Sequence, residues 1–212
     1  MTERKTIDRK ALIVEAARKS LTMFGYKATT MDVVSKLAGV GKGTIYTFFA
    51  TKEELFGEIM RQLTQEMKAI VVERIVDSRS FFDNLTDALH GVLQFRETHE
   101  LVIKLTQELR ELGTPAVREA LTELENAVLL FIEKEVQKAQ DKGDIRRMDP
   151  KLTAFMMIRM YVTLAIDWSA QHQPLTREEV EEQFTSLFRY GICPAGMQGE
   201  PDTGAGAVPS GS

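Results

Sequence analysis

The sequence predicts an all-α fold of about nine helices, arranged as a small N-terminal bundle and a larger C-terminal bundle. Apolar residues recur at helical spacing over long segments, with few strand-like alternations. No proline occurs before Pro115, and glycine or proline marks most of the breaks between periodic segments. The composition, 43% hydrophobic and 27% charged, excludes a disordered chain, a collagen-like chain and a disulfide scaffold.

Three helices are expected in the first 49 residues. The helix over 7–24 carries one apolar stripe that ends before Gly25, a stop signal, and consists of Ile13, Ala17, Leu21 and Phe24. The helix over 29–38, with Thr29 and Asp32 at its start, turns four residues inward: Met31, Val34, Leu37 and Ala38. The tight break Gly39-Val40-Gly41 then leads into a short helix over 42–49.

The remaining helices form the body. A capping box of Thr51 and Glu54 opens a long helix that extends to about Val76. Further helices are expected over 81–96, 98–112, 115–140, 150–170 and 176–190, and the glycine- and proline-rich residues 193–212 are expected to be a disordered tail. The predicted domains are therefore 1–52, 53–192 and the tail.

Charge is distributed unevenly along the chain. Residues 1–52 carry a net charge of +6, whereas residues 53–212 carry −10. A basic head on an acidic body indicates an anionic partner for the head alone, and a nucleic acid is such a partner. Chance clustering of charges on solvated faces is the alternative.

Other function classes find little support in the sequence. The single cysteine, Cys193, excludes an internal disulfide and fits a reducing compartment, and the three histidines lack metal-ligand spacing. No uncharged run approaches the ~20 residues of a membrane-spanning helix, and no secretory signal begins the chain. We therefore expect a cytoplasmic protein that has no metal, cofactor or membrane partner and is not an enzyme.

The first three helices have the order and the tight turn of a helix-turn-helix. On the third helix, Ile45 and Phe49 are four residues apart and are expected to face the core. The outward residues can supply charge, hydroxyl groups and close backbone approach to a DNA groove: Lys42, Gly43, Thr44, Tyr46 and Thr47. A bundle with a glycine turn and no DNA partner is the alternative for the same residues.

Residues 13–56 closely resemble the DNA-binding region of the TetR/AcrR family of bacterial transcriptional repressors. The resemblance rests on Ala16-Ala17, Gly25-Tyr26, Thr29, Ala38-Gly39-Val40, Lys42-Gly43-Thr44-Ile45-Tyr46, Phe49 and Lys52-Glu53-Glu54-Leu55. It implies that the outward residues of the third helix contact the major groove, with Gly43 touching DNA through its backbone. It also implies that Thr30 and Lys52 contact flanking phosphates.

Two positions depart from the family pattern. The family often has serine where this chain has Gly41, and histidine or tyrosine where it has Phe48. Because phenylalanine cannot donate a hydrogen bond to a phosphate, Phe48 is expected at most to pack on a sugar or a thymine methyl group.

The body is expected to provide a dimer interface and a ligand pocket. Helix 150–170 is apolar nearly all round, so it must be covered on more than one side. The family dimerises through its last two helices, which here implies an interface of Phe155, Tyr161, Val180, Phe184, Leu187 and Phe188. The expected pocket residues are His90, Phe95, Glu108, Phe131, Phe155, Met156, Arg159, Met160, Asp167 and Trp168. A monomer with a central buried helix, and methionines that serve only as core, are the alternatives.

These features together predict a homodimeric transcriptional repressor that binds a double-stranded DNA operator. A small hydrophobic effector, such as an acyl chain, an acyl-CoA or a lipophilic drug-like compound, is expected to relieve repression. Two other interpretations stay open: a ligand-independent DNA-binding activator or architectural protein, and a lipid-binding helical protein with no DNA role.

Overall fold

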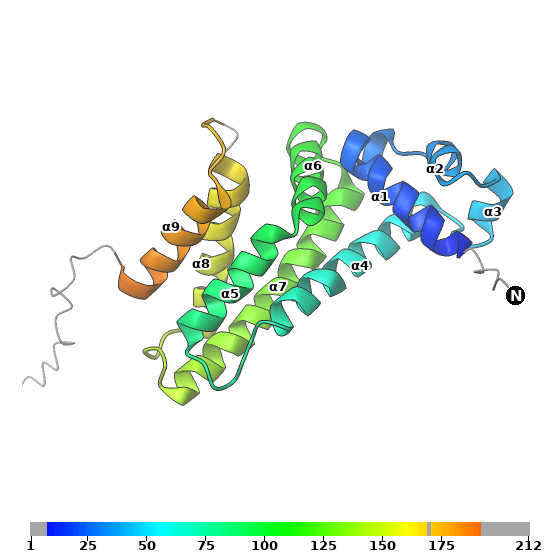
Figure 1. The fold of residues 1–212 in the computed structure, drawn as a ribbon. Helices are drawn as coiled ribbons and strands as arrows, with labels where there is room; N and C mark the ends of the chain where they lie inside the picture. The colour runs from blue at the N-terminus through cyan, green and yellow to red at the C-terminus, as the bar shows by residue number, and fades with distance from the viewer. Residues whose placement is uncertain (1–7, 169–170, 192–212) are drawn as a thin grey trace, which may run out of the picture.

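The structure, a computed structural model, describes residues 8–168 and 171–191 (Figure 1). These residues form nine α-helices and one π-helical segment and contain no strand, which confirms the all-α fold. The helices are α1 (Arg9–Ala28), α2 (Met31–Ala38), α3 (Lys42–Tyr46), α4 (Lys52–Val72), α5 (Phe81–Gln94), α6 (Arg96–Leu112), α7 (Pro115–Lys142), α8 (Pro150–Val162) and α9 (Arg177–Tyr190), with the π-helical segment at Thr163–Asp167.

The small head lies at one end of an elongated body. In Figure 1, α1, α2 and α3 form the head, and α4 extends from it into the body beside α5 and α7. Helices α8 and α9 lie at the opposite end of the molecule. Helix α6 packs against α1, so the body contacts the head through α6 as well as through α4.

A kink at Gly25 shapes the first helix. Gly25 has φ 81° and ψ 176°, a conformation that L side chains rarely adopt. The kink turns the Tyr26 ring into the core, where its centroid lies 4.7 Å from that of Phe56. Phe24, which was expected to complete the inward stripe, is 49% exposed, so that expectation was wrong.

Helix α2 begins at Met31, two residues later than predicted. The Thr30 hydroxyl, and not that of Thr29, caps the helix by accepting a hydrogen bond from the Val33 N–H at 3.2 Å. The buried Thr29 hydroxyl instead donates to the Gly25 carbonyl at 2.8 Å. Leu37 was expected to face inward but is 51% exposed, because no described element covers that side of α2.

The hydrophobic core continues across the predicted boundary after residue 52. One cluster joins Ile13, Leu21 and Ile45 of the head to Leu63 of α4 and Leu105 of α6. Since head and body share this core, they meet at a packed junction and not at a free linker. A second cluster fills the far end of the body with Leu89, Leu93, Val136, Met157, Val180 and Phe184.

Several body elements differ from their predicted form. The Thr51 hydroxyl caps α4 as expected, but the Glu54 carboxylate accepts from the Ala50 N–H and not from that of Thr51. Helix α4 ends at Val72, and the π-helical segment replaces the regular helix predicted beyond Val162. The predicted tail lies outside the described residues. None of the described helices combines the length and the apolarity that crossing a membrane requires.

Candidate DNA-binding surface and internal cavity

The turn between α2 and α3 fixes how the short third helix is presented. Gly39 ends α2 in the left-handed conformation at φ 63°, and the Val40 N–H donates to the Ser35 carbonyl at 3.1 Å. Ile45 and Phe49, 0% and 5% exposed, face the core as the sequence predicted. The helix itself ends at Tyr46 and not at residue 49, so Phe49 is buried from the turn that follows α3. The burial of these two residues leaves the opposite side of α3 facing solvent.

The outer side of α3 carries most of the residues expected to contact DNA. Lys42, Gly43, Tyr46 and Thr47 are exposed, whereas Thr44 is half-buried. The Thr47 hydroxyl donates to the Thr44 carbonyl at 2.7 Å, so it is already engaged within the helix. An added Cβ at Gly43 would meet no atom within 4 Å, so packing inside the protein does not require a glycine there.

Lys42 forms an ion pair that sequence reasoning missed. Its Nζ lies 2.8 Å from Oδ1 of Asp32 in the first turn of α2, and both side chains are exposed. The hydrogen bond and the charge of Asp32 raise the pKa of Lys42, and Lys42 lowers the pKa of Asp32 in return. The contact holds the lysine of α3 against the start of α2. The ten-residue separation carried no sequence signal for this pair.

The two other expected phosphate contacts lie at helix starts. Thr30 is exposed, and its hydroxyl caps α2. Lys52 is the first residue of α4, and its Nζ lies 4.0 Å from the centroid of the Tyr26 ring, in a cation–π contact. Burial lowers the pKa of Lys52, and the nearby charges of Glu53 and Glu108 oppose that effect.

A cavity of about 780 Å³ lies in the body between α4, α5, α6, α7 and α8. Its size falls within the range of small-molecule sites. Most of the lining is apolar and includes Met67, Val71, Leu85, Val92, Val102, Leu109, Leu121, Val128, Phe131, Met157 and Tyr161. Burial raises the pKa of the Tyr161 phenol, so this phenol is neutral at ordinary pH.

Charged side chains complete the lining of the cavity. Arg110 of α6 forms an ion pair with Asp167 of the π-helical segment, and Arg159 of α8 forms one with Glu125 of α7. Three further lining cations, Lys68 of α4 and Arg118 and Lys134 of α7, make no ion pair with a described residue. The lining thus combines an apolar surface with cations that are not neutralised by described carboxylates.

Three of the ten expected pocket residues line the cavity: Phe131, Arg159 and Asp167. The structure places the other seven elsewhere: His90, Phe95, Glu108, Phe155, Met156, Met160 and Trp168. Phe155, Met156 and Trp168 are exposed, and Met160 packs beside the second core cluster. Phe95 is the single residue between the end of α5 and the start of α6. Helical periodicity placed these residues on body helices but did not fix which side of each helix the neighbouring helices would cover.

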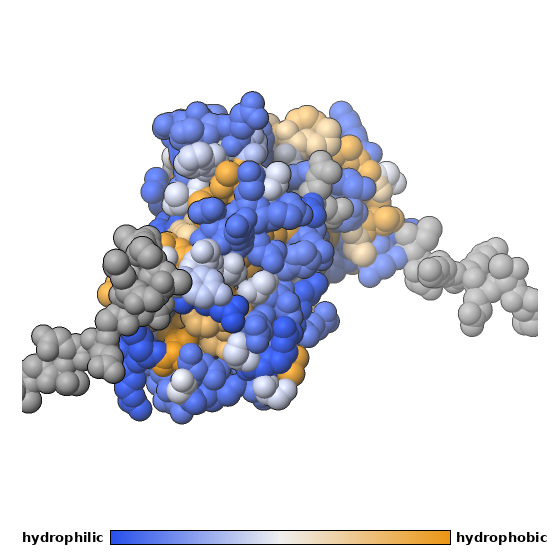
Figure 2. Space-filling model, turned by 60° about the vertical axis from the view of Figure 1, so that its left-hand side comes forward, coloured by the Kyte–Doolittle hydropathy of each residue, from blue (hydrophilic) through white to orange (hydrophobic). Residues whose placement is uncertain are grey.

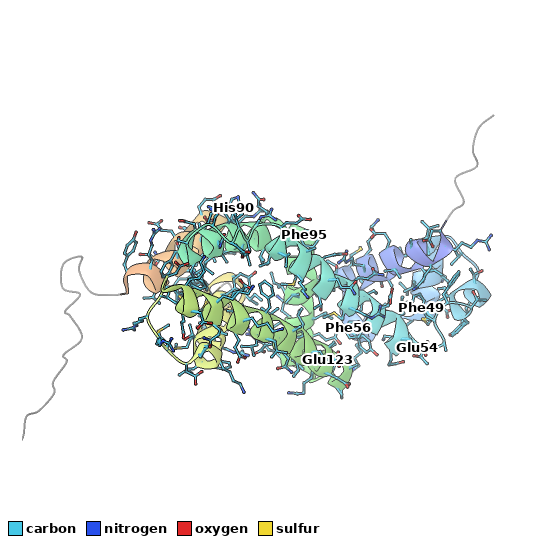
Figure 3. The ribbon with its side chains drawn as sticks, turned by 90° about the horizontal axis from the view of Figure 1, so that it is seen from below. Phe49, Glu54, Phe56, His90, Phe95 and Glu123 are labelled. Carbon is cyan, nitrogen blue, oxygen red and sulfur yellow. The ribbon has the colours of Figure 1, made fainter. Side chains whose placement is uncertain are left out.

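Two of these displaced residues have polar partners away from the cavity. His90 lies on the outer side of α5, as Figure 3 shows, and its Nδ1 is 2.9 Å from the Glu181 carboxylate. Glu108 is buried where α6 meets the Gly25 kink and accepts hydrogen bonds from the backbone of Tyr26 and Lys27. Glu108 was expected to line the pocket, whereas the structure places it at the junction of α6 with the kink.

The residues expected at a dimer interface divide into two groups. Val180 and Phe184, 2% and 3% exposed, are buried in the core of their own subunit, and Tyr161 and Phe188 pack beside that core. Tyr161 and Phe188 are half-buried, whereas Phe155 and Leu187 are 45% and 41% exposed.

Exposed apolar residues surround Phe155 and Leu187 on α8 and α9. They are Leu152, Met156 and Tyr190, which were not predicted to lie at an interface. Figure 2 brings this side of the molecule forward and shows apolar residues interrupting a mostly hydrophilic surface. We define the α8–α9 face as Leu152, Phe155, Met156, Leu187 and Tyr190. Within the described part of the chain, no cluster of histidine, cysteine, aspartate or glutamate is arranged to hold a metal ion.

Family models match both parts of the chain. The model for bacterial regulatory proteins of the tetR family matches residues 13–59, and that for the tetracyclin repressor-like C-terminal domain matches residues 78–192. The HTH-type transcriptional regulator YhgD of Bacillus subtilis is 51% identical over 175 residues, which are 82% of this chain and 92% of that protein. The fatty acid metabolism regulator protein of Bacillus subtilis is 25% identical over 185 residues, 85% of this chain and 93% of that protein.

Solved structures share the fold. The fatty acid degradation regulator FadR from Bacillus halodurans superposes with a TM-score of 0.73 at 17% identity, covering 89% of this chain and 98% of that one. The TetR family transcriptional regulator PfmR from Thermus thermophilus superposes with a TM-score of 0.65 at 22% identity, covering 85% and 98%. With the exposed helix-turn-helix of the head and the two matching family models, the chain belongs to the TetR family of bacterial DNA-binding transcriptional regulators.

Proposed function

We propose that this regulator is a homodimeric repressor that acts in the bacterial cytoplasm and leaves its operator when a hydrophobic effector enters the body. The observation that carries the proposal is the pairing of an exposed α3 surface with an apolar cavity of about 780 Å³ in one molecule. A helix that reads DNA and a cavity that takes a ligand are the two sites that a ligand-responsive regulator needs.

The head supplies the DNA-binding chemistry. Lys42 contributes a cation, Tyr46 a phenol, and Gly43 a backbone without a side chain, all exposed on α3. Thr30 caps α2 and Lys52 is the first residue of α4, and from these positions they can contact the phosphates that flank the groove. The net charge of +6 over residues 1–52 favours approach to the polyanion.

The cavity lining favours an amphiphilic effector with an apolar chain and an anionic end. Apolar side chains form most of its wall, and Lys68 and Arg118 offer positive charge that no described carboxylate neutralises. An acyl group carried as a coenzyme A thioester has both features. Two relatives whose names refer to fatty acid metabolism or degradation support this class.

An effector changes DNA binding only through its difference in affinity for two conformations of the protein. Coupling between sites in one protein is typically about 1–3 kcal/mol, which corresponds to about 5- to 150-fold in operator affinity. We expect the effector-bound dimer to hold its two heads away from the spacing of about 34–36 Å that successive turns of the major groove require.

The α8–α9 face is the proposed dimer interface. Its five apolar side chains are exposed in the single subunit. A two-fold contact between identical faces would bury these side chains in both subunits. We expect Phe155→Asp and Leu187→Asp to convert the dimer to a monomer in light scattering, because each places a charge in the interface. The control is Leu112→Asp, which adds the same charge at an exposed leucine outside this face. A dimer that both interface variants preserve would refute the assignment.

The DNA-binding proposal is tested by fluorescence anisotropy with the DNA upstream of the protein's own gene. Lys42→Ala and Tyr46→Ala are expected to weaken binding at least tenfold without changing helicity or oligomeric state. Lys42→Ala should also reduce the slope of log affinity against log salt by about 0.9 for each phosphate that the variant no longer neutralises. Lys151→Ala removes a similar exposed charge at the far end of the body and serves as the control. Wild-type affinity in both α3 variants contradicts the proposal.

The effector proposal is tested with palmitoyl-CoA, palmitate and coenzyme A alone. Palmitoyl-CoA is expected to raise the melting temperature and to weaken operator binding, whereas coenzyme A alone, which lacks the apolar chain, does neither. Binding of palmitoyl-CoA without any binding to upstream DNA would favour a lipid-binding protein with no DNA role. Operator binding that no member of the series alters would favour a ligand-independent regulator.

A further inference from the structure

A buried carboxylate connects the body to the head at the Gly25 kink. Glu108 of α6 is 6% exposed. Its Oε2 accepts from the Tyr26 N–H at 2.5 Å, and its Oε1 accepts from the Lys27 N–H at 3.1 Å. The Thr114 hydroxyl donates to Oε1 at 2.9 Å from the loop after α6. The side chain thus joins two backbone groups of the head to the end of one body helix.

The absence of a side chain at Gly25 leaves room for this carboxylate. A Cβ added at Gly25 would lie 2.4 Å from Oε2 of Glu108, closer than any van der Waals contact allows. Gly25 also has φ 81°, so the same residue provides the turn and the space. The kink exposes the N–H groups of Tyr26 and Lys27, which a continuous helix would have used internally.

Helix α6 contacts the head with one face and lines the cavity with the adjacent face. Leu101, Leu105 and Glu108 face α1, and both leucines are fully buried in the core that head and body share. On the adjacent face, Val102, Thr106, Leu109 and Arg110 line the cavity. Because Glu108 is flanked by cavity-lining residues on one rigid helix, a displacement of α6 by a cavity occupant moves the carboxylate and the kink together.

The kink in turn adjoins residues assigned to DNA. Tyr26 packs on Phe56, its hydroxyl donates to the Glu53 carboxylate at 2.8 Å, and Lys52 stacks on its ring. Thr30, the N-cap of α2, lies two residues beyond the end of α1. A shift of Tyr26 and Lys27 is therefore transmitted directly to the start of α2 and to Lys52.

We propose that Glu108 is a positioning residue that sets the orientation of the head relative to α6, and through it the spacing of the two recognition helices in the dimer. This inference rests on the proposed function, because spacing matters only to a dimer that reads a two-fold operator. Glu108 contacts no DNA in this scheme and acts only through the backbone of Tyr26 and Lys27.

The experiment compares Glu108→Gln with Glu111→Gln, a matched control that changes an exposed carboxylate on the same helix. Two DNA duplexes are used. One is the operator that footprinting locates in the DNA upstream of the protein's own gene, and the other is the same duplex with one base pair inserted at its centre. The ratio of the two affinities is unaffected by the fraction of folded protein, so a loss of stability alone does not change it. Amide hydrogen exchange at Tyr26 and Lys27 is measured on the same samples.

We expect Glu108→Gln to speed exchange at least tenfold for whichever of the two amides faces the new NH₂ group, because the glutamine side chain presents one acceptor oxygen where the carboxylate presents two. The preference for the native spacing should fall at least fivefold, while Glu111→Gln matches the wild type in both measurements. Thr114→Val removes only the hydroxyl that orients the carboxylate and should give the same changes to a smaller extent. It takes the place of Glu108→Gln if the latter does not fold.

Each contrary outcome has a distinct meaning. Unchanged exchange, or an unchanged spacing preference with faster exchange, overturns the positioning role of Glu108 and leaves the repressor proposal in place. Equal effects of Glu111→Gln also overturn it, because the effect would then follow from charge and not from the hydrogen bonds to the kink. A wild-type protein that binds no upstream DNA refutes the proposed function itself, and the positioning role with it.

Discussion

Replacing Gly43 with alanine should separate the stability of the head from its DNA affinity. Gly43 lies in α3 with ordinary helical φ, and an added Cβ meets no protein atom within 4 Å. Alanine is favoured over glycine in a helix by about 0.5–1 kcal/mol, so Gly43→Ala should raise the free energy of unfolding by about that amount. Nothing inside the described protein offsets this gain.

The same substitution should weaken operator binding. If the backbone at Gly43 approaches DNA closely, the new methyl group occupies the space that a phosphate or sugar needs. A loss of at least tenfold in affinity, or about 1.4 kcal/mol, is expected despite the more stable fold. Urea unfolding at fixed protein concentration gives the first quantity, and fluorescence anisotropy with operator DNA gives the second.

Gly57→Ala is the matched control. Gly57 lies within α4, is exposed, and likewise has no atom within 4 Å of the place that an added Cβ would take. It should gain similar stability and keep wild-type operator affinity. If Gly43→Ala also binds with wild-type affinity, the backbone of α3 does not approach DNA and the docking geometry is wrong.

Gly25→Ala is expected to lower the free energy of unfolding by about 3 kcal/mol, from backbone strain and the clash with Glu108, which urea unfolding measures. Asp32→Asn releases Lys42 from its ion pair and removes a negative charge beside it. Operator affinity should therefore rise severalfold at low salt. An unchanged affinity would show that the ion pair does not compete with DNA. Burial raises the pKa of Tyr26, so stability should be full below about pH 10 and should fall as pH rises above it, by up to about 1.4 kcal/mol per pH unit. In Tyr26→Phe, the free energy of unfolding, measured by denaturant at several pH values, should no longer show this fall above about pH 10. A pH profile identical to that of the wild type would contradict the assignment to Tyr26.

Local patterns were enough to predict the helices and the outward side of α3. The four-residue spacing of Ile45 and Phe49 predicted their burial, because the chain keeps one helical turn after Tyr46, in which the Phe49 N–H donates to the Ile45 carbonyl. Glycine signals predicted the ends of α2, α6 and α7 at Gly39, Gly113 and Gly143, since glycine takes the left-handed conformation without strain. The stop predicted at Gly25 was wrong, because α1 kinks there and continues to Ala28. The exposure of Phe24 could not be predicted this way, because it depends on the kink that brings Tyr26 inward.

The body shows where periodicity stops being informative. Helix α8 is apolar on several sides, so its sequence does not distinguish Met157, which lines the cavity, from Phe155 and Met156, which face outward. Val180 and Phe184 have the same ambiguity between a subunit core and a dimer interface. Packing of neighbouring helices resolves these choices, because an apolar side chain has no preference among apolar surroundings.

Local sequence is enough to predict the class of the fold, the position of the helix-turn-helix and the residue types on its outer side, because each follows from residues within a few positions of one another. The contact of Glu108 with the backbone of residue 26, 82 positions away, and the ion pair of Lys42 with Asp32 follow instead from how the helices pack. The sequence shows that a polar group needs a hydrogen-bond or ion-pair partner if it is buried, but the packing of the helices determines which residue that partner is.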